Sequence, residues 1–77
     1  MQPKIMIVDD EVSICISLSL ALQPAYGVAW ETDPARALER LRAEAFDLVL
    51  LDLVLGEKSG LDVLQQIKTL DQRILVI

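Results

Sequence analysis

Three aspartates, Asp9, Asp10 and Asp52, are the residues of this chain best suited to chemistry by type and position. Asp9 and Asp10 directly follow the apolar run Ile5–Val8, and Asp52 directly follows the apolar run Leu48–Leu51. A short apolar run followed by a helical pattern is typical of a buried parallel strand, and ligands of open α/β sheets bind beyond the carboxyl ends of such strands. Carboxylates packed together repel one another and lose hydration. Three of them in one crevice therefore indicate a hard metal ion and phosphoryl chemistry.

The aspartates need strands and helices that place them at one edge of a sheet. Apolar runs bounded by turn residues predict strands at Lys4–Val8, Val28–Glu31, Phe46 or Asp47 to Leu51, and Arg73–Ile77. Helical spacing predicts helices at Glu11–Gln23, Pro34 to about Glu44, and about Gly60 to Leu70. The order βαβαβαβ implies a parallel sheet with right-handed crossovers.

Local signals refine the second and third helices. Asp33 is expected to cap the second helix, with Pro34 at its first position, and Gly56–Gly60 is expected to form a loop. Charged residues on the second helix are interpreted as a solvated face with i,i+4 pairs. The apolar positions at helical spacing are Ala37, Leu38, Leu41, Leu61, Leu64 and Ile67.

Composition limits the function classes that remain. The chain has 77 residues, a net charge of −5 and a pI of about 4.4, which argues against direct binding to nucleic acid. It contains no histidine, which excludes histidine-based catalysis, and Cys15 is its single cysteine, which excludes an internal disulfide. The longest apolar stretch, Ile14–Leu22, is far shorter than the roughly 20 residues that span a bilayer. We therefore expect one small cytoplasmic domain without a membrane span.

Three segments together resemble the receiver domain of two-component response regulators. They are Ile5–Glu11 with its acidic pair, Leu48–Leu53 with its single aspartate, and Gly60–Leu64, whose glycine lies eight positions beyond Asp52. The resemblance extends over all 77 positions but covers about the first two-thirds of a receiver. It implies a flavodoxin-like α/β fold, with strand order 2-1-3-4, in a single domain (residues 1–77) truncated after strand four.

The resemblance also implies a role for each acidic residue. Asp52 matches the phosphoacceptor, which takes a phosphoryl group from a sensor histidine kinase, a phosphotransfer protein or a small acyl phosphate. Asp10 matches the direct Mg²⁺ ligand, and Asp9 matches the second acid of the pair, which usually acts through water. The backbone carbonyl of Val54 matches a further Mg²⁺ ligand, and Asp52 itself contributes to the site. The implied protein is a signalling domain rather than an enzyme.

Three departures from the family pattern affect this expectation. Gly56 stands where the family usually has a proline, so the loop is expected to be looser. The Ser or Thr after strand four and the Lys after strand five have no counterpart in this chain, and neither Lys58 nor Lys68 matches that lysine in position. Without the hydroxyl and the lysine, stabilisation of the phosphoryl group is expected to drop.

The first helix and the last strand are expected to leave apolar surface uncovered. Cys15 is interpreted as a small buried hydrophobe, yet Cys15, Ile16 and Leu20 fall where a receiver usually shows charge. The positions assigned to the core-facing stripe of this helix are Ile14, Leu18, Ala21 and Leu22. We therefore expect a homodimer, formed through the first helix and the uncovered sheet or through strand four.

Other interpretations of the acidic pair and of the function of the chain stay open. Asp9 and Asp10 alone would suit a solvated pair at a helix N-terminus, and Glu11 suits the helix dipole. A truncated receiver that dimerises and does no chemistry is the main alternative function. A small aspartate-nucleophile phosphatase is weaker, because Val54 stands where that class needs a second aspartate.

Overall fold

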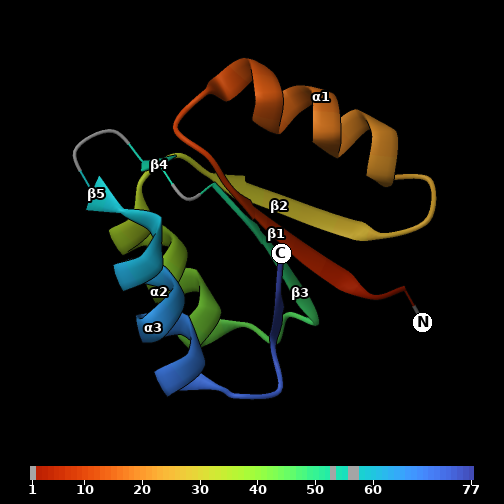
Figure 1. The fold of residues 1–77 in the computed structure, drawn as a ribbon. Helices are drawn as coiled ribbons and strands as arrows, with labels where there is room; N and C mark the ends of the chain where they lie inside the picture. Colours follow the sequence, from red (N-terminus) through yellow and green to blue (C-terminus); the bar gives the residue numbers. More distant parts are fainter. Residues whose placement is uncertain (1, 53, 56–57) are drawn as a thin grey trace.

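A parallel sheet lies at the centre of the computed structural model and separates one helix from two others (Figure 1). The structure describes residues 2–52, 54–55 and 58–77. The strands of the sheet are β1 (Lys4–Val8), β2 (Gly27–Glu31), β3 (Leu48–Leu51) and β6 (Leu75–Val76). Helix α1 (Val12–Leu22) covers one face, and α2 (Pro34–Ala43) and α3 (Gly60–Leu70) cover the other.

The strand order is β2-β1-β3-β6, which confirms the predicted 2-1-3-4 order with β6 as the fourth strand. All pairings in this sheet are parallel, and the order reverses between β1 and β3. Ile77 extends the ladder beyond β6, because its N–H donates to the Val49 carbonyl at 2.9 Å and its carbonyl accepts from the Leu51 N–H at 2.8 Å.

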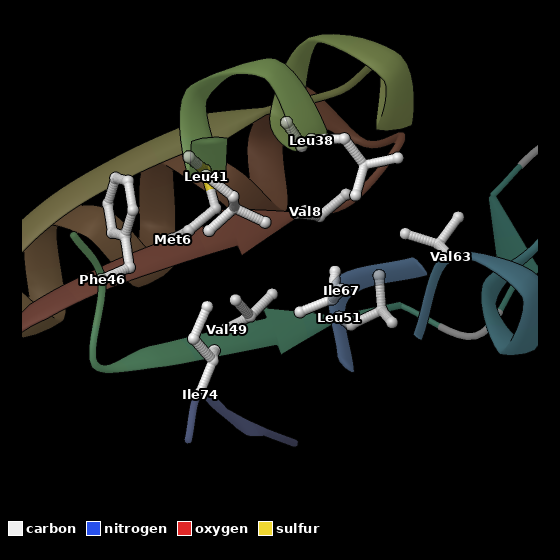
Figure 2. Packing of buried hydrophobic residues seen from close by; sticks show 11 residues of the cluster. Met6, Val8, Leu38, Leu41, Phe46, Val49, Leu51, Val63, Ile67 and Ile74 are labelled. Carbon is white, nitrogen blue, oxygen red and sulfur yellow. The ribbon is translucent and has the colours of Figure 1, made fainter. Parts of the chain in front are cut away.

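The main core fills the space between the sheet and the helices α2 and α3 (Figure 2). The predicted inner face of α2 is confirmed: Ala37, Leu38 and Leu41 are buried against β1 and β3. Asp33 caps this helix as predicted, since its carboxylate accepts from the Ala35 N–H at 3.0 Å. The sequence predicted this helix correctly because its cap residue, its first-turn proline and its apolar spacing all indicate the same helix.

The outer face of α2 carries the expected i,i+4 ion pair, with Arg40 Nε 3.5 Å from Glu44 Oε2. Glu44 also lies 3.2 Å from the Lys4 ammonium, which ties the C-terminal end of α2 to the start of β1. The hydrogen bond from Lys4, followed by the charges of Lys4 and Arg40, lowers the pKa of Glu44. Exposed pairs of this kind add little stability.

The observed orientation of α1 differs in part from the predicted one. Cys15 and Ser19 are its buried residues, whereas Ile14 is more than a third exposed and Ala21 is exposed. Of the four positions predicted to face the core, Leu18 and Leu22 pack there, Ile14 is only partly covered, and Ala21 does not face the core, while the burial of Cys15 is confirmed. The reason is that apolar and small residues surround this helix on every side, so the sequence carries no contrast that fixes its rotation.

The segment before α3 differs from the expected loop. Val54–Leu55 (β4) and Lys58–Ser59 (β5) pair as a short antiparallel hairpin, so the loop prediction for Gly56–Gly60 is wrong at Lys58–Ser59. The expectation of a looser loop at Gly56 lies outside the described residues. In α3, Val63 and Ile67 are buried, and Leu61 is exposed.

Substitution of Ile67 and of Leu61 tests which face of α3 is buried. Ile67 is fully buried, so replacing it by Ala is expected to lower the free energy of unfolding by about 2–5 kcal/mol through the cavity left behind. Leu61 is 63% exposed, so Leu61→Ala is expected to change it by less than about 0.5 kcal/mol. Urea denaturation measures both, and equal losses would contradict the orientation.

Candidate metal centre

The pairing of β1 with β3 sets the position of the acidic residues. Val8 pairs with Leu51, so Asp9 and Asp52 leave neighbouring strands side by side. The Asp52 N–H donates to the Val8 carbonyl at 3.0 Å, which extends the ladder to the acidic residue itself. The carboxyl ends of both strands therefore deliver their side chains to one crevice, where the strand order reverses.

Asp9, Asp10 and Asp52 come together as the sequence predicts. Each offers a carboxylate oxygen, and these oxygens all lie within 4.8 Å of one another. Asp9 and Asp52 are half-buried, and Asp10 is exposed. Three converging carboxylate oxygens with access to water match the needs of Mg²⁺, which takes oxygen ligands and keeps several of its waters.

Asp9 is held by hydrogen bonds from several directions. Its N–H donates to the carbonyl of Glu31, at the end of β2, over 3.3 Å. Its Oδ1 accepts from the Glu11 N–H at 2.9 Å, and its carbonyl accepts from the Cys15 thiol at 3.5 Å. Burial, and next the charge of Asp9, raise the pKa of the Cys15 thiol, so the thiol stays protonated and can donate.

Asp9 and Asp10 do not occupy the capping position of α1, which a pair that only caps the helix would need. The capping position is Glu11, and its side chain makes no capping hydrogen bond. Asp9 lies before that position and accepts from the Glu11 backbone in an Asx-type turn. Asp9 and Asp10 are thus placed at the strand end, beside Asp52, rather than in the first turn of the helix.

A cavity of about 420 Å³ opens beside the acidic residues, between α1 and the ends of β1 and β3. Asp9 and Asp52 form its polar part. The apolar residues that line it are Ile7, Ile14, Leu18, Leu50, Leu51 and Ile77. Asp9 and Asp52 are therefore accessible at the surface of this cavity.

Val54 and Lys68 are two further residues that the sequence analysis considered for the site. Val54 begins β4, two residues beyond Asp52, and its carbonyl as a metal ligand stays a prediction. Lys68 donates to the carbonyls of Gln72 and Ile74, beyond the C-terminal end of α3. Lys68 therefore stabilises the turn into β6, in keeping with the expectation that it does not act as the family lysine.

Reasoning from the sequence did not identify Glu31 and Cys15 as residues that hold Asp9. Glu31 acts through its backbone, and a backbone acceptor leaves no residue-type signal. Cys15 has a signal in its spacing, because Cys15, Ser19 and Leu22 recur at i, i+4 and i+7. The uniformly apolar and small composition of the helix hid that spacing.

Comparison with known proteins decides the family. Residues 5–77 match the family described as the response regulator receiver domain. This chain is a response regulator receiver domain. The match supports the phosphoacceptor role in general and the signalling class, and it does not favour the alternative of a structural module.

Relatives and solved structures agree with this assignment. The receiver is 39% identical over 77 residues to the transcriptional regulatory protein ZraR of Klebsiella oxytoca, covering 99% of this chain and 17% of the relative. The chain therefore spans about a sixth of that protein. Its fold matches CheY4 of Vibrio cholerae with a TM-score of 0.91 at 24% identity, covering 99% of this chain and 66% of the other.

A second similar structure contains a phosphorylated aspartic acid. It is a response regulator protein from Burkholderia pseudomallei with a phosphorylated aspartic acid, a calcium ion and citrate. The receiver matches it with a TM-score of 0.89 at 25% identity, covering 96% of this chain and 44% of that one. Within the residues that the structure describes, no helix of the receiver is long and apolar enough to cross a membrane.

Proposed function

We propose that this receiver accepts a phosphoryl group on Asp52 and uses Mg²⁺ to do so. The observation that carries the proposal is the convergence of three carboxylate oxygens, from Asp9, Asp10 and Asp52, within 4.8 Å. The residues proposed to hold the ion are these three aspartates and the backbone carbonyl of Val54. When bound, Mg²⁺ offsets negative charge on the incoming phosphoryl oxygens.

The protein contributes to the proposed reaction by positioning the acceptor carboxylate. A carboxylate oxygen of Asp52 attacks the phosphorus of the donor, and the bond from phosphorus to the donor breaks, with its electron pair leaving on the donor. The backbone of Asp52 is fixed by its hydrogen bond to Val8, so the acceptor carboxylate starts from a defined place. A fixed geometry lowers the entropic part of the barrier to in-line attack.

The similar Burkholderia protein supports both halves of the proposal. That protein carries a phosphorylated aspartic acid together with a calcium ion. We infer that the phosphodonor of the present receiver is a sensor histidine kinase or a phosphotransfer protein, acting in the cytoplasm. The net charge of −5 supports the further proposal that these 77 residues make no direct contact with nucleic acid.

Incubation with acetyl phosphate and Mg²⁺ tests the acceptor role. Intact mass spectrometry is expected to show one added phosphoryl group that is stable in acid and labile in base. Asp52→Asn is expected to abolish the adduct, because the amide is not a nucleophile here. Asp62→Asn, at an exposed aspartate in the first turn of α3, serves as the matched control and is expected to keep it. A folded protein without an adduct would contradict the proposal.

We also propose that the receiver forms a homodimer through apolar surface on α1 and β6. Large apolar side chains are exposed on α1 at Val12, Ile16 and Leu20, and on the last strand at Leu75 and Ile77. No charged residue interrupts α1, so two copies can approach there without the repulsion that a net charge of −5 causes elsewhere. Exposed apolar patches of this kind mark interaction surfaces.

A pair of matched variants tests this association. Leu20 in α1 is 67% exposed and Leu61 in α3 is 63% exposed, so each accepts Glu without loss of core packing. Sedimentation velocity is expected to show a dimer for the wild type and for Leu61→Glu, and a monomer for Leu20→Glu. A wild type that is monomeric at every concentration would overturn the proposal, and a dimer of Leu20→Glu would exclude α1 as the interface.

A further inference from the structure

The carbonyl of Asp9 lies between the two neighbouring aspartates of the candidate metal centre. It belongs to the peptide group that joins Asp9 to Asp10, and the six atoms of a peptide group are coplanar. Fixing this oxygen therefore fixes the plane between the two aspartates and the direction in which the chain continues to Asp10. A hydrogen bond at this carbonyl therefore acts on the backbone that joins the two aspartates.

Cys15 supplies that hydrogen bond from inside the fold. Its thiol donates to the Asp9 carbonyl over 3.5 Å, and the side chain is fully buried. It packs in the cluster beneath α1 with Ile5 and Ile7 of β1, so its rotamer is held by both the helix and the strand. A donor that is locked by packing can orient its acceptor.

The other two bonds to Asp9 come from the backbone. Glu31 contributes a carbonyl and Glu11 contributes an N–H. Substitution of these residues leaves the backbone groups in place, whereas substitution of Cys15 removes its donor. Cys15 is therefore a side-chain contact through which the sequence can tune the position of Asp9.

We infer that Cys15 is a positioning residue for the Asp9–Asp10 pair and acts through the Asp9 carbonyl to set the affinity for the divalent cation. This inference rests on the proposed Mg²⁺ site. It assigns Cys15 a role beyond that of a small buried hydrophobe. Groups that orient metal ligands typically change metal affinity by ten- to a hundredfold when they are removed.

Two variants separate packing from hydrogen bonding. Cys15→Ser and Cys15→Ala remove similar volume from the core, but serine keeps a hydroxyl donor and alanine has none. A purely structural role predicts similar effects on Mg²⁺ affinity from both. The positioning role predicts that serine rescues the affinity and alanine does not.

Isothermal titration with Mg²⁺ measures the difference. We expect Cys15→Ala to bind Mg²⁺ roughly tenfold more weakly than the wild type, and Cys15→Ser to bind within about threefold of it. Urea denaturation is expected to show that both variants remain folded. Equal losses of affinity in the two variants, or no loss in either, would overturn the inference.

A measurement without metal keeps the inference separate from the proposed function. In EDTA, the amide NMR signals of Asp9 and Asp10 are expected to shift or broaden in Cys15→Ala and to stay near their wild-type positions in Cys15→Ser. If the wild type does not bind Mg²⁺, the proposed function fails, and these amide signals still decide the role of Cys15. Unchanged Asp9 and Asp10 signals in Cys15→Ala would overturn that role.

Discussion

The parallel pairing of β1 with β3 is the interaction on which the rest of the site depends. At one end of this pair, Asp47 exchanges hydrogen bonds with the backbone of Lys4, donating to its carbonyl at 2.9 Å and accepting from its N–H at 2.8 Å. At the other end, the pairing of Val8 with Leu51 brings Asp9 and Asp52 together. A slip of one residue would turn the apolar side chains of a strand to the opposite face, so burial on both faces holds the register. The same apolar packing that stabilises the sheet therefore places the charges.

The two faces of the sheet are covered to different extents. Helices α2 and α3 seal one face over the larger core, which includes the fully buried Met6 and Val49 (Figure 2). On the other face, α1 packs on β1 and β2 and leaves the side of β3 and β6 with exposed Leu75 and Ile77. The acidic residues lie at the edge of this open side. Within the described residues, Asp9 and Asp52 thus border the same surface as these exposed apolar side chains.

Particular residues explain what the sequence could and could not predict. The apolar runs before Asp9 and Asp52 predicted the strands and the meeting of the three aspartates, because buried parallel strands need continuous apolar segments. The strand order was predicted from the resemblance to receiver domains. Cap and spacing fixed α2 in the same way. The rotation of α1 was predicted only in part: Leu18 and Leu22 pack on the core, but Ile14 and Cys15 are both apolar, and tertiary packing decides that Cys15 is the more buried of the two. The hairpin of β4 and β5 was missed because two-residue strands carry no periodic signal, and the bond from Asp9 to Glu31 was missed because it joins backbone groups.

Three like charges converge in this site, and the proposed divalent cation offsets their repulsion. Two unit charges about 4 Å apart repel by about 1 kcal/mol in water and by about 4 kcal/mol near a protein surface. Thermal unfolding of the wild type and of Asp10→Asn, each in EDTA and in Mg²⁺, tests the claim most directly, with Glu39→Gln as a charge-matched control on the far face of α2. We predict that Asp10→Asn is more stable than the wild type in EDTA, and that Mg²⁺ stabilises the wild type and Glu39→Gln more than Asp10→Asn. Equal stability of all three proteins in EDTA, with no difference in their response to Mg²⁺, would contradict it.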